Sequence, residues 1–276
     1  MSGAGLRGHR IGWGTRSTTS AGLRCTRGLG RFMVGAVLFD LGDTLFDLQT
    51  NDPRRYLEQG TRLAHRYLVE RGFGPPPLNK YLPRIVRAVQ WAYLRSRITL
   101  REIQLIDLIV RTHRKMGIRL DAASAEQYAR HCHEPIRRVF KVTPGADETL
   151  RRVREAGYAV GLVSNTFMIS KVMDEDLRAA DLLDLFDVRV WSCDVGYAKP
   201  HPIIFRVALE RLGVEADRTM FVGDLIDTDV KGAKRLGMTT VLKVSDGRLP
   251  PGRYRPDHVI RRITEVPALL RRCRVA

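Results

Sequence analysis

Residues 34–45 read Val-Gly-Ala-Val-Leu-Phe-Asp-Leu-Gly-Asp-Thr-Leu, an apolar run that ends at Asp40 and a polar loop. A short apolar run bounded by glycine and polar residues is typical of a buried strand, which we expect over residues 34–39. The same pattern recurs later in the chain, at residues 158–163, 188–191, 219–222 and 239–244. The sequence therefore predicts the strands of one buried sheet.

Helical patterns lie between these later strands. Each ends at a glycine, the residue that most often closes a helix, and the three patterns run from 146 to Gly157, from 203 to Gly213 and from 228 to Gly237. Strands that alternate with helices predict an α/β fold of three layers, in which helices cover both faces of a parallel sheet. Ligands of such sheets bind beyond the carboxyl ends of the strands.

Residues 48–140 interrupt this alternation, because they are helical almost throughout. Asp52 and Pro53 are typical of a helix N-terminus, and that helix should end near Gly72. Residues 99–102 and 124–127 both fit the capping-box pattern at the start of a helix. We expect about four helices that form a smaller α-helical domain over residues 48–140, inserted into a core of residues 33–47 and 141–276.

The chain carries 47 Lys or Arg against 30 Asp or Glu, and its net charge of +17 is concentrated in two blocks. Residues 1–32 hold six arginines and no acid, and residues 48–140 hold 18 basic against eight acidic residues. A basic helical domain above an anion site would raise the local concentration of an anionic substrate. A solvated, arginine-rich surface without a function explains the same charge. Nucleic acid is not an expected partner, since no helix-turn-helix or aromatic stacking motif accompanies the charge.

The first 32 residues form a leader rich in Gly, Arg, Ser and Thr. This composition is typical of an organellar transit peptide, whereas a secretory signal needs a continuous apolar segment. The alternative is that translation starts at Met33, directly before the first strand. In either case we expect residues 1–32 to contribute nothing to the fold.

Composition limits the class of protein. Hydrophobic residues make up 44% and charged residues 28% of the chain, as is ordinary for a globular protein. No apolar run approaches the roughly 18 residues that cross a bilayer, so no membrane partner is expected. The cysteines form no Cys-x-x-Cys pattern, which argues against a disulfide framework or a zinc site and favours the reducing cytoplasm. Nothing in the sequence indicates an oligomeric state.

Residues that can do chemistry follow the predicted strands in four short segments. They are carboxylates, a hydroxyl, an amide, a lysine and a loop glycine: Asp40, Gly42 and Asp43; Ser164 and Asn165; Lys199; Asp224 and Asp229. Taken singly, an aspartate at a strand end is often only a turn residue or a helix cap. The four segments in this order, with a helical insertion between the first two, resemble the haloacid dehalogenase-like hydrolase superfamily over roughly residues 34–244.

The resemblance implies a Rossmann-like core with a C1-type helical cap, Mg²⁺ as cofactor, and hydrolysis of a small anionic phosphorylated substrate. The chemistry of the residues agrees. A carboxylate such as Asp40 can attack phosphorus to form an aspartyl phosphate, which divides one hydrolysis into two easier steps. Mg²⁺ prefers oxygen ligands, which Asp40, Asp224 and the backbone carbonyl of Gly42 can supply, while Asp229 would support the water shell of the metal.

The phosphoryl group needs positive charge and hydrogen-bond donors. Lys199 provides a compact cation that would assist phosphoryl transfer. Ser164 and the backbone amide of Asn165 can donate hydrogen bonds to the phosphoryl oxygens. These are the roles that the superfamily's motifs imply for the matching positions.

Position 42 departs from the superfamily's pattern. Most of its phosphatases carry a second aspartate two residues after the nucleophile, where it protonates the leaving oxygen and later activates water, and here that residue is Gly42. Asp43 stands one residue later and could act instead, but a shift of one residue in a tight loop turns a side chain elsewhere. General acid–base help is typically worth ~10² to 10⁴ in rate.

Three functions therefore stay open. The first, which we favour, is a Mg²⁺-dependent phosphatase that acts through Asp43 or on substrates with an acidic leaving group. The second is a haloacid dehalogenase-type hydrolase in which Asp40 attacks carbon; that branch needs no metal, so Asp224 and Asp229 argue against it. The third is a catalytically weak module that binds a phosphorylated partner or a nucleic acid through its basic cap.

Three other features have simpler interpretations. Ser164 is not expected to be a serine-hydrolase nucleophile, because no Gly-x-Ser-x-Gly motif surrounds it. In residues 131–133, His-Cys-His, alternate side chains on a helix point apart, so a structural role is expected rather than a metal site. The aromatic residues Tyr81, Trp91 and Tyr93 are expected to pack the helices of the inserted domain.

Overall fold

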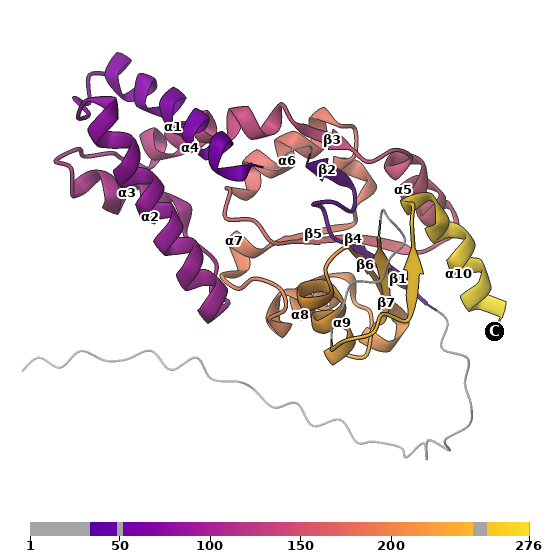
Figure 1. The fold of residues 1–276 in the computed structure, drawn as a ribbon. Coiled ribbons are helices and arrows are strands. Elements are labelled where there is room, and N and C mark those ends of the chain that lie inside the picture. The colour runs from indigo at the N-terminus through magenta and orange to yellow at the C-terminus, as the bar shows by residue number, and fades with distance from the viewer. Residues whose placement is uncertain (1–33, 49–51, 245–252, 276) are drawn as a thin grey trace, which may run out of the picture. The chain divides into compact units, whose positions relative to one another are not determined.

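The computed structural model describes residues 34–48, 52–244 and 253–275 (Figure 1). The expectations for the leader at residues 1–32 and for a start at Met33 lie outside the described residues. The fold below is that of one compact unit, Phe32–Ala276.

Parallel strands form one sheet in the order β5-β4-β1-β6-β7-β8. Their bounds are β1 (Ala36–Phe39), β4 (Ala159–Ser164), β5 (Val188–Trp191), β6 (Thr219–Gly223), β7 (Thr239–Lys243) and β8 (His258–Ile260). The first five confirm the strands expected from the apolar runs. The last, β8, is too short to show a periodicity in the sequence.

Helices cover both faces of the sheet, which confirms the three-layer α/β fold. Successive residues of a strand point to opposite faces of the sheet. The residues of β1 therefore pack alternately in two different hydrophobic cores. Val37 and Phe39 pack in the same core as α5 (Ala146–Glu155) and α10 (Val266–Val275). Leu38 packs in the core that contains α8 (Pro202–Leu212) and α9 (Lys231–Arg235).

Shorter elements complete the core. They are α6 (Ser170–Ala179), α7 (Ser192–Val195), η1 (Leu183–Leu185), η2 (Ala216–Arg218), η3 (Ile226–Val230) and η4 (Ile263–Glu265). The helix expected over residues 228–236 instead begins as the wider π-type turn η3 and continues as α9. Such π-type turns are frequent at functional sites.

The inserted block contains α1 (Pro53–Glu70), α2 (Leu78–Thr99), α3 (Leu105–Arg114) and α4 (Ala122–Arg137). The side chain of Asp52 accepts a hydrogen bond from the Arg55 backbone amide at 3.1 Å, which confirms the expected start of the first of them. An antiparallel ribbon of β2 (Phe46–Leu48) and β3 (Phe140–Val142) joins the two points where the chain enters and leaves the block. The ribbon lies next to residues 48 and 140, the two boundaries that the sequence predicts for the inserted domain.

Both expected capping boxes are wrong. Thr99 ends α2 instead of starting a helix, and Glu102 accepts hydrogen bonds from the Ile103 backbone amide and from the Ser192 hydroxyl. At the second site the N-cap is Asp121, which accepts from the backbone amide of Ser124 at 2.7 Å. Asp121, which precedes Ser124 in the sequence, therefore caps this helix in place of Ser124.

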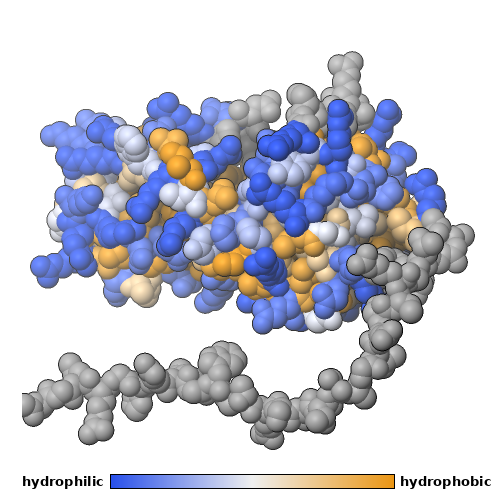
Figure 2. Space-filling view, turned by 90° about the horizontal axis from the view of Figure 1, so that it is seen from below, coloured by the Kyte–Doolittle hydropathy of each residue, from blue (hydrophilic) through white to orange (hydrophobic). Residues whose placement is uncertain are grey.

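The expectation that the aromatic residues pack the helices is right for Tyr81 and wrong for Trp91 and Tyr93. Tyr81 is fully buried, whereas Trp91 is 67% and Tyr93 is 52% exposed. The buried residues of α2 all lie in its first half, so its second half extends beyond the helices that cover it. On the face shown in Figure 2, hydrophilic residues predominate and apolar ones gather in smaller patches. Among the described residues, no helix has the length and apolarity needed to span a bilayer.

Candidate active site

The ends of three neighbouring strands bring predicted site residues together. Asp40 follows β1, Ser164 ends β4 and Asp224 follows β6, and β1 pairs with both of the other strands. Because the strands are parallel, their carboxyl ends meet at one edge of the sheet. The backbone amide of Asp40 donates to the Val222 carbonyl at 2.9 Å, which extends the β1–β6 ladder and fixes the start of the loop.

Lys199 lies between two carboxylates. Its Nζ is 2.6 Å from Asp40 Oδ1 and 2.8 Å from Asp229 Oδ1, and all three side chains are buried. Burial alone would lower the pKa of Lys199, but the carboxylates of Asp229 and Asp40 outweigh it and raise the pKa. Lys199 therefore stays a cation and offsets part of the negative charge.

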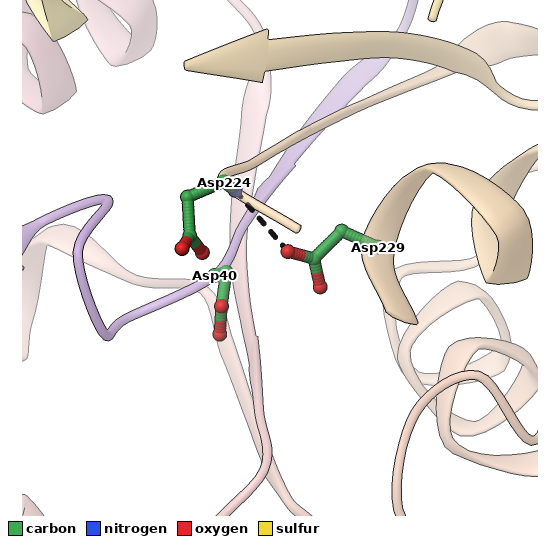
Figure 3. A group of neighbouring side chains, drawn as sticks. All are labelled: Asp40, Asp224 and Asp229. Carbon is green, nitrogen blue, oxygen red and sulfur yellow. Dashed lines mark hydrogen bonds between the residues drawn. The ribbon is translucent and has the colours of Figure 1, made fainter. Parts of the chain in front are cut away.

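Asp40, Asp224 and Asp229 each offer a carboxylate oxygen, and these oxygens lie within 4.8 Å of one another (Figure 3). Burial raises the pKa of Asp40 to about 6, an effect that the ammonium of Lys199 opposes. Burial, and then the charges of Asp229 and Asp40, raise the pKa of Asp224 to about 8. One ammonium does not fully compensate three close carboxylates.

This carboxylate group fits a hard divalent cation. Its donors are oxygens, the ligand type that such cations prefer, and the three carboxylates share only the ammonium of Lys199, which leaves negative charge that a cation would offset. The sequence predicts this group residue by residue, because each aspartate follows or lies close to a strand end.

The backbone around Asp229 holds its carboxylate in place. Its Oδ2 accepts hydrogen bonds from the backbone amides of Asp224 at 3.2 Å and Leu225 at 3.0 Å, while Oδ1 faces Lys199. Gly223 makes room for this contact, since a Cβ there would lie 2.5 Å from Asp229 Oδ2. Both oxygens of Asp229 are thus already engaged.

The Asn165 side chain has a position that the sequence does not reveal. Its Oδ1 accepts from the Lys199 backbone amide at 2.6 Å, and its Nδ2 donates to the Lys199 carbonyl at 3.1 Å. This pair of bonds fastens the segment that carries Lys199 to the end of β4. Ser164, one residue earlier, is 4% exposed. The only signal in the sequence is that Asn165 follows a strand.

Gly42 and Asp43 face different surroundings. Gly42 lies in the wall of a cavity that Ser164 and Asn165 also line, and a Cβ at Gly42 would meet no heavy atom within 4 Å. Asp43 is exposed, has a left-handed φ of 49°, and lines a second hollow together with Asp224 and Lys243. The Lys243 ammonium donates to the Asp43 carbonyl at 2.7 Å, which fixes this turn of the loop.

The cavity beside Ser164 has a volume of about 530 Å³ and is lined by the loops at the sheet edge and by all four helices of the inserted block. The contacts between α4 of the block and α6 of the core include a salt bridge and a buried histidine–carboxylate contact. Arg130 Nη1 lies 2.6 Å from Glu175 Oε2, and His133 Nε2 lies 2.6 Å from Asp176 Oδ2. The ring of His131 instead packs against Tyr67, so the two histidines contact different neighbours.

Comparisons with known proteins agree with this geometry. A family model described as haloacid dehalogenase-like hydrolase matches residues 34–237. A glyceraldehyde 3-phosphate phosphatase from Methanopyrus kandleri is 30% identical over 226 residues, which span 80% of this chain and 86% of that protein.

Solved structures with the same fold include a HAD phosphatase from Thermococcus onnurineus. It matches with a TM-score of 0.58 and 28% identity, over 86% of this chain and 98% of that one. A 2-haloacid dehalogenase from Pseudomonas syringae matches with a TM-score of 0.64 and 23% identity, over 87% of this chain and 99% of that one. The match to the dehalogenase shows a shared fold alone.

Proposed function

This chain belongs to the haloacid dehalogenase-like hydrolases, and from that premise we propose that it is a Mg²⁺-dependent phosphatase of small phosphorylated metabolites. The observation that carries the proposal is the group of the buried Asp40, Lys199 and Asp229 and the partly buried Asp224 at the carboxyl edge of the sheet. The phosphatase names of two similar proteins support it.

Asp40 acts as the nucleophile. One of its carboxylate oxygens attacks phosphorus, the bond between phosphorus and the leaving oxygen breaks, and an aspartyl phosphate forms. Water then attacks the phosphorus of this acyl phosphate, which releases inorganic phosphate and restores the carboxylate. A pKa of about 6 leaves Asp40 mostly ionised at neutral pH, as a nucleophile requires.

Asp40, Asp224 and the Gly42 carbonyl would hold the Mg²⁺ ion. When bound, the ion supplies positive charge that offsets the repulsion between the nucleophile and the phosphoryl group. Asp229 has a supporting part, because both of its oxygens already accept hydrogen bonds or face Lys199. It positions the ammonium of Lys199 and the turn at residues 224–225.

The phosphoryl oxygens are bound by Lys199, by the Ser164 hydroxyl and by the Asn165 backbone amide. Preorganised donors of this kind stabilise charge that develops during transfer. The Asn165 side chain acts through another residue, since it fixes the backbone of Lys199.

Asp43 is the candidate that protonates the leaving oxygen, because position 42 is glycine. Asp43 lines a hollow together with Asp224 and does not line the cavity beside Ser164, so it would approach the leaving oxygen from the side of the carboxylate group. Substrates with an acidic leaving group, such as acyl phosphates, need less of this help.

Residues 48–140 form the cap and residues 33–47 and 141–276 the catalytic core. The ribbon of β2 and β3 at both junctions supports this division, and the cavity lined by helices of the block and by loops of the core supports a cap above the proposed phosphoryl site. Closure of such a cap excludes water from the reaction. The free thiols of Cys132, Cys193 and Cys273 support the cytoplasm as the compartment.

The test is release of phosphate or halide from a panel of phosphomonoesters, acyl phosphates and 2-haloacids, with Mg²⁺ or with a chelator. We expect Mg²⁺-dependent phosphate release that Asp40→Asn abolishes. Asp227→Asn is the matched control, because this neighbouring aspartate is exposed, and it should keep wild-type activity. Metal-independent halide release would contradict the proposal and favour a dehalogenase. Salt-sensitive retention on nucleic acid without turnover would favour a binding module.

A further inference from the structure

The cavity beside Ser164 adjoins the proposed phosphoryl site and offers room for the part of the substrate that is not phosphate. Its wall contains Leu41 and Gly42, which follow the nucleophile directly, and Ser164 and Asn165, the proposed phosphoryl ligands. The leaving group of a phosphoryl group bound by Ser164 and Asn165 would have room in the roughly 530 Å³ that the loops and the helices of the inserted block surround. Ligand cavities commonly span roughly 300 to 1,000 Å³.

The wall on the cap side is mostly apolar. It is built from branched aliphatic side chains of α1, α2 and α3, among them Leu57, Ile85, Val89, Leu105 and Ile109. On the core side, Met168 adds to the apolar lining. Of the Asp, Glu, Lys and Arg side chains that the structure describes, only Arg54 is part of this wall. The positive charge of the cap therefore lies mainly outside the cavity, where it attracts an anion without contacting the leaving group.

His113 and Tyr128, two polar residues of the wall, already form hydrogen bonds within the cap. His113 Nδ1 donates to the Ile109 carbonyl at 2.8 Å, and His113 Nε2 lies 2.7 Å from the hydroxyl of Tyr81. That hydroxyl lies 2.8 Å from the hydroxyl of Tyr128. Burial lowers the pKa of His113 and raises the pKa of Tyr128, so both side chains are neutral near pH 7. This part of the wall offers a ligand no charge.

We propose that this enzyme prefers phosphomonoesters whose alcohol is bulky, apolar and uncharged, such as an arylalkyl alcohol. The inference rests on the proposed phosphatase function and names its substrate class. The hydroxyls of a small polyol would lose water against the aliphatic wall with few partners to replace it, which is unfavourable. An aromatic or branched apolar group would fill the same space and bury apolar surface.

The proposed substrate class also differs from the substrate for which one relative of this chain is named. The protein from Methanopyrus kandleri is named for glyceraldehyde 3-phosphate, a short and polar substrate. In this chain such a substrate would occupy only a small part of the cavity.

Two substrates with primary alcohols as leaving groups test the proposal: 2-phenylethyl phosphate and glycerol 3-phosphate. We expect kcat/KM to be at least about tenfold higher for 2-phenylethyl phosphate. Val89→Asn places an amide in the cavity wall and should lower kcat/KM for this substrate by about tenfold, with little loss for glycerol 3-phosphate. Val69→Asn is the matched control, because Val69 is 55% exposed and is not among the residues that line the cavity. Phe167→Ser, in a partly exposed wall position, gives a second variant should Val89→Asn not fold.

Equal or faster turnover of glycerol 3-phosphate would overturn the substrate class and leave the phosphatase function intact. If no phosphate ester were turned over, the proposed function would fail instead. Binding of the matching phosphonates to the wild-type protein, measured by calorimetry, then decides the substrate class separately. Tighter binding of 3-phenylpropylphosphonate than of 3,4-dihydroxybutylphosphonate supports an apolar site, and the reverse order overturns it.

Discussion

Lys199 Nζ lies 2.6 Å from Asp40 Oδ1, although the whole inserted block separates the two residues in the chain. Asp40 is placed by the end of β1, and Lys199 is held through its backbone by Asn165 at the end of the adjacent strand β4. The pairing of these two strands thus sets the distance between the carboxylate and the ammonium. The proposed nucleophile and its positive partner are therefore positioned by the sheet rather than by the inserted block.

Replacing Lys199 by methionine should destabilise the metal-free protein. The change leaves Asp40 and Asp229 buried without their shared cation, and breaking a buried pair in this way typically costs about 3 to 5 kcal/mol. Urea unfolding in the presence of a chelator measures the loss. Lys234→Met is the control, since the Lys234–Asp257 pair is more than a third exposed and should contribute about 1 kcal/mol or less. Equal stability of Lys199→Met and the wild type would mean that this pair is not formed.

Mg²⁺ should bind more tightly as pH rises. Without a cation the pKa of Asp40 is about 6 and that of Asp224 about 8, so binding between pH 6 and pH 8 must displace a proton, chiefly from Asp224. The affinity should improve up to about tenfold per pH unit in this window, with about one proton released. Calorimetry in buffers of different ionisation enthalpy counts the protons, and Asp224→Asn should reduce the count. Binding that does not change with pH would contradict the raised pKa values.

The same carboxyls set the pH dependence of stability without metal. In the unfolded chain they ionise near pH 4, whereas the folded protein keeps the protons of Asp40 to about pH 6 and of Asp224 to about pH 8. The folded state therefore binds more protons between these limits, and the free energy of unfolding should fall as pH rises through them. Urea unfolding at pH 5 and pH 8 with a chelator checks the sign. Asp224→Asn should flatten the slope.

Gly42→Asp should raise turnover on poor leaving groups. The new Cβ would meet no heavy atom within 4 Å, so the loop has room for a side chain there. An acid at this position could protonate the leaving oxygen, and the gain should reach about 10²-fold for alkyl phosphates and be smaller for acyl phosphates. Steady-state kinetics on both classes compare this variant with Asp43→Asn. If neither class responds to Gly42→Asp, position 42 does not limit the enzyme.

Gly60→Ala should destabilise the protein, although alanine normally favours a helix over glycine by about 1 kcal/mol. Gly60 lies in α1 against α4, where a Cβ would be 2.1 Å from the Cys132 carbonyl oxygen. The two helices would have to move apart, so the melting temperature should fall. Gln59→Ala, at an exposed position of the same helix, is the control and should leave it nearly unchanged. A higher melting temperature for Gly60→Ala would show that the helices do not pack this closely.

Much of the core could be predicted from the sequence, because buried parallel strands are continuous apolar runs. The runs ending near Phe39, Val163 and Val222 are confirmed as strands, and the aspartates that follow the first and the last of these strands lie close together as expected. Strand ends locate side chains well, since a parallel sheet brings them to one edge.

The contacts between distant side chains could not be predicted. The link from Asn165 to the backbone of Lys199 depends on how two loops approach each other, which no local pattern encodes. The capping box at Thr99 failed because Glu102 has a distant partner, Ser192. The apolar cavity is equally hidden, because its wall is assembled from helices whose faces are decided only by packing.

The central claim, that Asp40 becomes phosphorylated during turnover, has a direct measurement. The enzyme is quenched in acid during steady-state hydrolysis with Mg²⁺, treated with borohydride, which reduces an acyl phosphate to an alcohol, and digested for peptide mass analysis. We predict homoserine at position 40 in the wild type, and none without substrate, without Mg²⁺ or in Asp40→Asn. Full turnover of substrate with residue 40 unmodified in every sample would contradict the account.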